Sequence, residues 1–103
     1  MEQLFCVVYR FVVKPGREVE FEQVWRELTG LIREHQSSRG SRLHRAADGV
    51  FIAYAQWPSR DAWKSPPKLP ASSDPIRAAM KDCCASIEVL HELDVVADLL
   101  VPS

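Results

Sequence analysis

The side chains of this sequence that could do chemistry are aromatic or titratable, and most lie in predicted strands. Trp57 and Trp63 flank a break between a strand and a helix, where two indole rings could stack on a planar ligand. Tyr9 and Tyr54 each carry a hydroxyl that could donate a hydrogen bond to a ligand oxygen. His91 could act as a base near neutral pH. The catalytic candidates are therefore His91, Tyr54 and Trp57, and the substrate-binding candidates include Tyr9, Trp57 and Trp63.

Each of these candidates also has a structural explanation. The two tryptophans could be core residues where two layers meet, and the backbone could satisfy a buried tyrosine. One histidine without an identified partner is weak evidence for catalysis, so His91 could instead serve the core or an interface. Met80 is a further substrate-binding candidate, but its place on the apolar face of a predicted helix is also typical of packing.

Other polar residues in apolar surroundings have simpler interpretations. Arg10 lies in an otherwise apolar strand and needs an anionic partner, so we expect a salt bridge to Glu92 or Asp94 of another strand. His35 continues the apolar stripe of the long predicted helix and is expected to cover the core. His44 lies in a polar edge strand and is expected to be exposed.

The three cysteines do not suggest a disulfide framework. Cys83 and Cys84 are adjacent, and a disulfide ring between neighbours is strained. A redox role for this pair is the alternative, although no neighbouring feature favours the thiolate. No spacing of Cys and His resembles a zinc site, and we expect neither a metal nor a cofactor. Unpaired thiols fit the reducing cytoplasm.

Length and composition describe one ordinary globular domain over residues 1–103. Hydrophobic residues make up 47% and charged residues 26%, with a formal net charge of −1. Lys and Arg are scattered, which argues against nucleic-acid binding. No apolar run approaches the roughly 20 residues that span a bilayer, and the amino-terminal residues lack the features of a signal peptide. We therefore expect no membrane partner.

Apolar periodicity and turn residues predict the elements that must position these side chains. A long amphipathic helix is expected over 17–37, where apolar residues recur with i, i+3, i+4, i+7 spacing. Asp48 and Gly49 predict a tight turn between two strands of a hairpin. The strands are expected over 4–13, 41–46, 50–57 and 87–101.

Two shorter helices are expected in the second half of the chain. Ser59 is expected to cap the first, which carries Trp63 on its buried face. Asp74 is expected to cap the second, with Pro75 at its first position. The proline-rich stretch 64–73 between them is expected to be irregular and could form a lid.

The order of these elements defines a fold class. It is the β-α-β-β-α-β order of a ferredoxin-like α+β sandwich, with a four-stranded antiparallel sheet and helices on one face. Both faces of the strands 4–13 and 50–57 are apolar, yet helices cover only one face of such a sheet. An identical subunit is the simplest candidate to cover the other, so we expect a homodimer.

Three segments resemble one known family over nearly the whole chain. They are residues 12–17 (Val-Val-Lys-Pro-Gly-Arg), 40–45 (Gly-Ser-Arg-Leu-His-Arg) and 54–63 (Tyr-Ala-Gln-Trp-Pro-Ser-Arg-Asp-Ala-Trp). The chain resembles the antibiotic biosynthesis monooxygenase (ABM) domain family. The resemblance implies a dimeric α+β barrel whose subunits pack sheet against sheet, each with a pocket between its sheet and its helices. Such patterns specify the fold better than the reaction.

The resemblance also allows one branch of the family to be tested by residue. Haem-degrading members carry an Asn on the first strand, a Trp shortly after the junction helix begins and a His on the next helix. Here the first strand has no Asn, the Trp position falls within 64–67, and the His position falls at Met80. Met80 could in principle bind iron, but packing explains it better. Haem degradation is therefore not expected.

The resemblance implies a cofactor-independent monooxygenase acting on a small aromatic or quinone-type molecule between sheet and helices. Such chemistry needs a substrate that can itself donate an electron to oxygen, and the protein then supplies a base or hydrogen-bond partner to form the anion and a dry pocket to hold it. Two alternatives stay open: a non-catalytic dimeric module that binds a small molecule, and an isomerase of a small metabolite.

Overall fold

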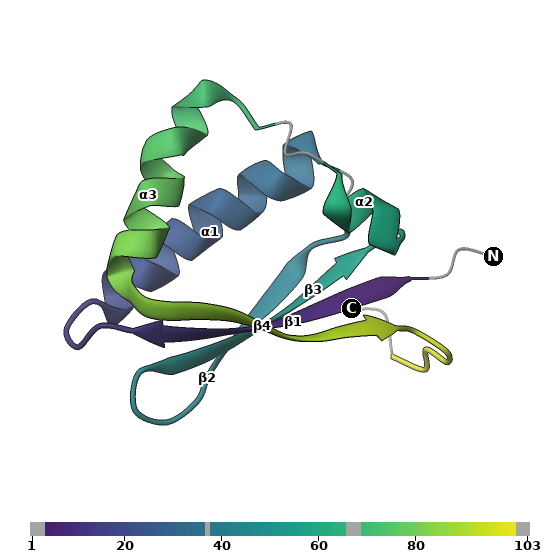
Figure 1. Ribbon diagram of the computed structural model, residues 1–103, viewed down its shortest axis with the longest axis horizontal. Coiled ribbons are helices and arrows are strands. Elements are labelled where there is room, and N and C mark those ends of the chain that lie inside the picture. Colours follow the sequence, from purple (N-terminus) through teal and green to yellow (C-terminus); the bar gives the residue numbers. More distant parts are fainter. Residues whose placement is uncertain (1–3, 37, 66–68, 101–103) are drawn as a thin grey trace.

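The computed structural model describes residues 4–36, 38–65 and 69–100, which form an antiparallel sheet with helices on one of its faces (Figure 1). The sheet has four strands in the order β2-β3-β1-β4. This arrangement confirms the predicted ferredoxin-like α+β fold. The elements are β1 (Phe5–Val13), α1 (Glu18–His35), β2 (Ser41–Arg45), β3 (Val50–Trp57), α2 (Arg60–Lys64), a 3₁₀ turn (Ala71–Ser73), α3 (Asp74–Cys83) and β4 (Cys84–Asp94).

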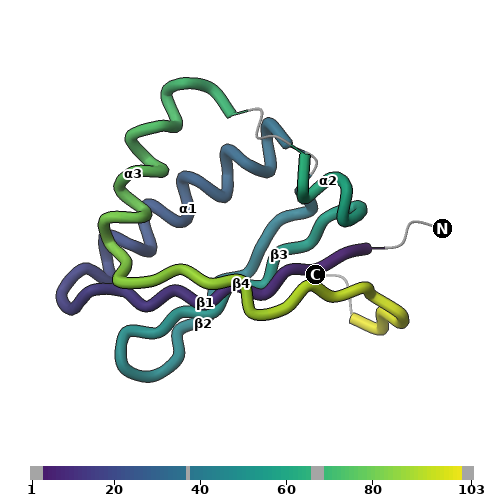
Figure 2. Tube along the Cα trace, viewed as in Figure 1, coloured from purple at the N-terminus to yellow at the C-terminus, as the bar shows by residue number. Residues whose placement is uncertain are grey.

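The central strand β1 decides which side chains meet the helices. It pairs with β3 on one side and β4 on the other, and Tyr9 lies opposite Ala53. Because side chains alternate along a strand, Tyr9 and its alternate neighbours face the helices, as do Phe51, Ala53 and Trp57 of β3. The trace in Figure 2 shows both long helices on this side of the sheet.

The core consists of two buried clusters that Tyr9 joins. In the first, Phe21 of α1 packs between Phe11 and Phe51, with ring centroids 5.1 and 5.0 Å apart. The second contains Phe5 and Trp57 at the other end of the sheet. Tyr9 packs against both clusters, and Ala53 of the first cluster and Ala55 of the second follow each other on the inner face of β3.

The last strand begins and ends earlier than the sequence predicts. The predicted range is 87–101, whereas β4 begins at Cys84, directly after α3, and ends at Asp94. Its length is set by its partner, because Asp94 lies opposite Phe5 at the start of β1. Just beyond Asp94, the Val95 N–H still donates to the Leu4 carbonyl at 3.0 Å, but residues 95–100 form no strand.

The predicted partner of Arg10 is wrong. Arg10 bonds Glu88, which lies directly across from it on β4, because an irregularity in β4 shifts the register between Val8 and Tyr9. Glu92 instead bonds Arg60 at the start of α2.

Of four further predictions about single residues, two are confirmed and two are wrong. Ser59 caps α2 as predicted, accepting a bond from the Ala62 N–H at 3.1 Å. His44 is exposed, also as predicted. His35 is exposed rather than over the core, because it lies in the last turn of α1. Asp74 is no cap, since the 3₁₀ turn runs directly into α3 and leaves Asp74 inside the helix. Pro66 and Pro67 of the predicted irregular stretch lie outside the described residues.

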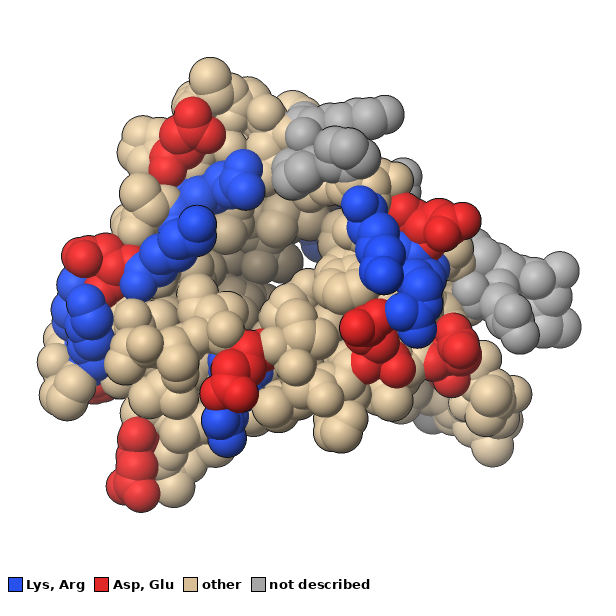
Figure 3. Space-filling model, in the orientation of Figure 1, with Lys and Arg blue, Asp and Glu red and all other residues tan. Residues whose placement is uncertain are grey.

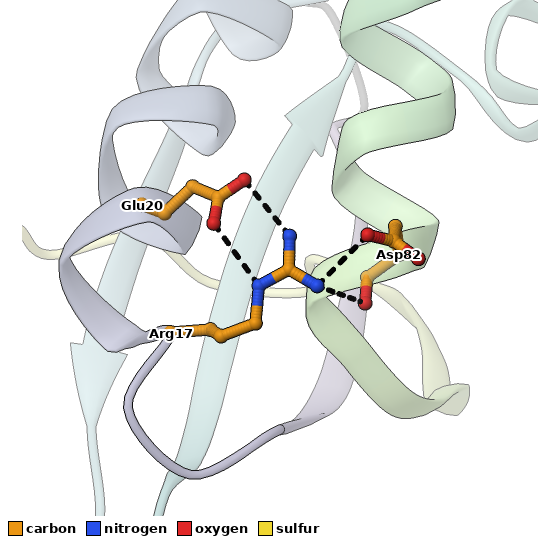
Figure 4. A network of polar contacts seen from close by, with 3 residues as sticks. All are labelled: Arg17, Glu20 and Asp82. Carbon is orange, nitrogen blue, oxygen red and sulfur yellow. Dashed lines mark hydrogen bonds and ion pairs between the residues drawn. The ribbon is translucent and has the colours of Figure 1, made fainter.

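The helices α1 and α3 are joined at one end by a single side chain (Figure 4). The guanidinium of Arg17 donates to both carboxylate oxygens of Glu20 at 3.0 and 2.9 Å. It also donates to the carboxylate and the backbone carbonyl of Asp82, at 2.8 and 3.0 Å, in the last turn of α3. A backbone bond from Lys14 to Cys83 lies beside it. Away from this junction the two helices diverge (Figure 1).

The Arg17 junction predicts a dependence of stability on pH. Hydrogen bonding to Arg17 lowers the pKa of Glu20 and of Asp82. Because these pKa values are lower in the folded than in the unfolded protein, the ionised carboxylates stabilise the fold at pH values above about 4, their pKa in the unfolded chain. This stabilisation is lost as the pH falls through the lower pKa values of the folded state. Arg17→Ala should therefore lower the free energy of unfolding at pH 7, with a difference from wild type that shrinks below about pH 4. Urea denaturation across this range would measure it.

Arg26→Ala provides the control, because Arg26 is exposed on α1 and makes no ion pair with a described residue. A difference for Arg17→Ala that is as large at pH 3 as at pH 7 would contradict the assignment.

Candidate functional site

A cavity of about 260 Å³ lies between the inner face of the sheet and the diverging helices. Its floor includes Ala53 and Ala55, which lie on β3 between the larger Phe51 and Trp57. Two methyl groups at the centre of the inner face leave space that bulkier side chains would fill. Figure 3 shows the hollow that this leaves in the middle of the molecule.

The walls of the cavity are mainly apolar. Trp25, Leu28 and Ile32 line it from α1, at the i, i+3, i+7 spacing that places side chains on one face of a helix. Met80 lines it from α3 and is buried. Trp57 closes one end. An apolar cavity with few polar groups is typical of a binding site for a small organic molecule.

The principal polar group at the floor is the hydroxyl of Tyr9. The indole N–H of Trp63 donates to the Tyr9 oxygen at 2.8 Å. Since an indole nitrogen can only donate, the hydroxyl hydrogen of Tyr9 is not used in this bond. Burial raises the pKa of Tyr9, and the bond from Trp63 opposes this only in part. Tyr9 is therefore protonated at neutral pH and has a hydrogen to donate.

Trp57, in the cavity wall, carries a donor without a partner. The residue is 6% exposed, and its indole N–H is buried and has no acceptor among the described residues. A buried donor without a partner costs about 1–3 kcal/mol.

The rim of the cavity is positively charged. Arg77 and Lys81 of α3 are exposed and line it, one helical turn apart. No Asp, Glu or His is found among the described residues that line the cavity. In Figure 3 basic side chains on α3 border the central hollow.

The structure brings some of the predicted site residues together and separates others. Tyr9, Trp57 and Met80 line the cavity, and Trp63 reaches it through Tyr9. Tyr54 and His91 lie on the outer face, where both are opposite Val8 in the register of the sheet.

On that outer face Tyr54 has partners of its own. Its hydroxyl lies 2.8 Å from the Cys6 sulfur, and the side chain of Gln56 donates to it at 3.4 Å. Burial, together with the bond to Cys6, raises the pKa of Tyr54. Leu99 and Leu100 of the carboxyl-terminal segment lie beside it.

The cysteines show no sign of activation. All three are buried free thiols, and burial raises the pKa of Cys83 and that of Cys84, the latter to about 11. Such thiols are poor nucleophiles at neutral pH. Within residues 4–36, 38–65 and 69–100, no three His, Cys, Asp or Glu side chains form a group that could hold a metal ion. The same residues include no helix both long and apolar enough to cross a membrane.

A second hollow lies at the other end of the sheet. It has a volume of about 420 Å³ and lies between the turn at Pro15 and Gly16 and the hairpin turn at Asp48 and Gly49. None of the predicted site residues lines it. We place the candidate site in the cavity beneath the helices, because Tyr9, Trp57 and Met80 line that cavity together.

Sequence reasoning missed several residues of this site, among them Trp25, Leu28, Ile32, Ala53, Ala55, Arg77 and Lys81. Ala53 and Ala55 carried a usable signal, because two small residues alternate on the inner face of a strand that is otherwise bulky. Arg77 and Lys81 also had one, since their i, i+4 spacing puts both on the same flank of the apolar stripe that contains Met80. Neither signal shows by itself that the helices leave a cavity.

Comparisons with known proteins agree with this architecture. The model of the antibiotic biosynthesis monooxygenase family matches residues 4–70, and the chain belongs to this family. Comparison with curated proteins finds no match.

Solved structures show the same fold at low sequence identity. A protein from Bordetella bronchiseptica, provisionally assigned as an antibiotic biosynthesis monooxygenase, has a TM-score of 0.76 at 21% identity, covering 92% of this chain and 99% of its own. A protein from Caulobacter crescentus with the same provisional assignment has a TM-score of 0.74 at 23% identity, with coverage of 93% and 92%. SnoaB from Streptomyces nogalater, a cofactor-independent oxygenase, has a TM-score of 0.68 at 20% identity, with coverage of 98% and 99%.

The hydrogen bond between Trp63 and Tyr9 can be tested through stability. Tyr9→Phe removes the acceptor and Trp63→Phe removes the donor, so each should lower the free energy of unfolding. The double variant should lose less than the sum of the two, by about 1 kcal/mol, which is the usual net contribution of such a bond. Chemical denaturation of the four proteins measures this coupling. Strictly additive losses would mean that the bond contributes nothing.

Proposed function

We propose that this protein is a cofactor-independent monooxygenase that binds a small aromatic molecule in the cavity between its sheet and its helices. The observation that carries the proposal is the hydroxyl of Tyr9 in an apolar cavity, because its hydrogen is not donated to any residue that the structure describes. A donor in this position would bind a ring oxygen of the substrate and stabilise it as an anion. Family membership and the likeness to SnoaB support this reaction class.

The chemistry can be written for a phenol with a free ring position. The phenol loses its proton to water, and the phenolate held by Tyr9 gives one electron to O₂. The resulting radical and superoxide combine to form a carbon–oxygen bond, and the peroxide takes up a proton. Loss of water then breaks the O–O bond and leaves a quinone carbonyl. One oxygen atom enters the product and the other leaves as water.

The volume of the cavity limits the size of the substrate. An apolar cavity of about 150 Å³ holds a benzene molecule. A cavity of about 260 Å³ therefore suits one or two fused rings, with larger substituents directed to the open side. Trp25 and Trp57 provide flat surfaces against which such rings could stack.

A non-catalytic binding module is the second candidate function. It is favoured by the lack of a carboxylate or an imidazole among the described lining residues, which leaves no general base beside the substrate. The same feature disfavours an isomerase, which would need groups that move protons between substrate atoms.

Incubation with 1-naphthol under ¹⁸O₂ tests the oxygenase directly. The expected product is 1,4-naphthoquinone carrying one ¹⁸O atom, formed faster than in buffer alone. Tyr9→Phe should lower the rate about 10- to 100-fold, because a hydrogen bond to a charged group contributes about 1.5–3 kcal/mol. Mass spectrometry and oxygen uptake measure both results.

Tyr54→Phe is the matched control, since it makes the same change on the opposite face of the sheet. It should have little effect on the rate. Loss of activity in Tyr54→Phe with none in Tyr9→Phe would place the reaction elsewhere. Binding of 1-naphthol without any turnover would favour the non-catalytic module.

We also propose that the outer face of the sheet forms a homodimer interface. Val8 and Ile52 are only half-buried there, and Leu93 nearby is 43% exposed. Ile52→Glu should therefore yield a monomer by light scattering at micromolar concentration, whereas wild type should be a dimer. Val19→Glu, the same kind of change at an exposed position of α1, should not alter the mass. A monomeric wild type would contradict the proposal.

A further inference from the structure

We propose that the substrate of this cavity carries an acidic substituent, such as a carboxylate, which Arg77 and Lys81 bind at the rim. This inference rests on the proposed function, because it assumes that an aromatic molecule occupies the cavity. It adds the class of that molecule: an aromatic acid whose ring oxygen meets Tyr9 while its anionic group remains at the helix α3.

The charges around the cavity are unbalanced. Its described lining contains two cations and no Asp, Glu or His. Elsewhere in the molecule, cations beside carboxylates are bound to them: Arg10 to Glu88, Arg17 to Glu20 and Asp82, Arg45 to Glu22, and Arg60 to Glu92. Arg77 and Lys81 make no ion pair with any residue of the described chain.

The acids nearest along α3 do not balance this charge. Asp82 is held by Arg17 at the junction of the two helices. Asp74 lies in the first turn of α3, three residues before Arg77, but no ion pair joins the two among the described residues. Two unneutralised cations one turn apart therefore make a positive rim around an apolar cavity, which favours an anion attached to an apolar body.

The two ends of the site lie in different layers. Tyr9 belongs to the central strand of the sheet, whereas Arg77 and Lys81 belong to the helix that covers it. A ligand that meets both groups must have its oxygen and its acidic group at opposite ends of the ring system. The exposed cations also remain hydrated, so they select between ligands while the apolar walls provide most of the binding energy.

Matched probes can test this selection. The first is 6-hydroxy-2-naphthoate, which has a hydroxyl and a carboxylate at opposite ends of two fused rings, and the second is its neutral methyl ester. Wild type should bind the acid about fivefold more tightly than the ester by titration calorimetry, the effect of two solvent-exposed ion pairs. Raising the salt concentration from about 50 to 500 mM should reduce this preference, because the charges are exposed.

Arg77→Gln/Lys81→Gln should bind the two probes equally well, with the affinity for the ester unchanged. Unchanged ester binding also shows that the variant is folded. Arg26→Gln/Arg33→Gln is the control, since it removes two exposed cations of α1 that do not line the cavity. This control variant should retain the preference of wild type for the acid over the ester.

The outcomes separate this inference from the function on which it rests. Equal binding of acid and ester by wild type would overturn the inference and leave an aromatic-binding cavity in place. A preference that persists in Arg77→Gln/Lys81→Gln would also overturn it, because the anion would then bind elsewhere. Binding of neither probe would contradict the proposed function itself.

Discussion

The junction of α1 and α3 at Arg17 determines where this molecule has room for a ligand. The guanidinium joins the first turn of α1 to the last turn of α3, and the adjoining strands fix both helix ends to the sheet. Two helices held together at one end and diverging from there cannot cover a sheet evenly. Phe21 fills the narrow end between Phe11 and Phe51, and the cavity occupies the wider part.

The sheet beneath completes the site with a few residues. The small side chains of Ala53 and Ala55 leave space above the sheet, and Trp57 forms one end of the cavity. Tyr9 is held by Trp63 in an arrangement that leaves its proton available, at a pKa raised by burial. These features belong to the inner face alone. The outer face is a surface of another kind, where half-buried apolar side chains such as Val8 and Ile52 lie among polar ones such as Tyr54 and His91. We have proposed that a second subunit covers it.

Much of the fold could be predicted from the sequence, because periodicity reports which face of an element is buried. The long helix, the hairpin at Asp48 and Gly49 and the cap at Ser59 were all evident. The register of β4 was not, because it depends on an irregularity that no local pattern reveals. In the observed register Arg10 lies opposite Glu88 and pairs with it, in place of the predicted Glu92 or Asp94.

The candidate site was predictable only in part, for a related physical reason. Aromatic type identified Tyr9 and Trp57, but it selected Tyr54 as well, since alternation does not tell which face of an apolar strand meets the helices. Arg77 and Lys81 were not singled out from the sequence, because a cavity arises from the angle between two helices. That angle is a tertiary property which depends on Arg17 and the core.

Assigned NMR spectra of the protein titrated with 1-naphthol test the central claim most directly. An aromatic ligand in the cavity should shift the indole N–H signals of Trp57 and Trp63, and leave the signals of His44 and His91 on the outer face unchanged. Shifts confined to the outer face, with both indole signals unmoved, would contradict a binding site between the sheet and its helices.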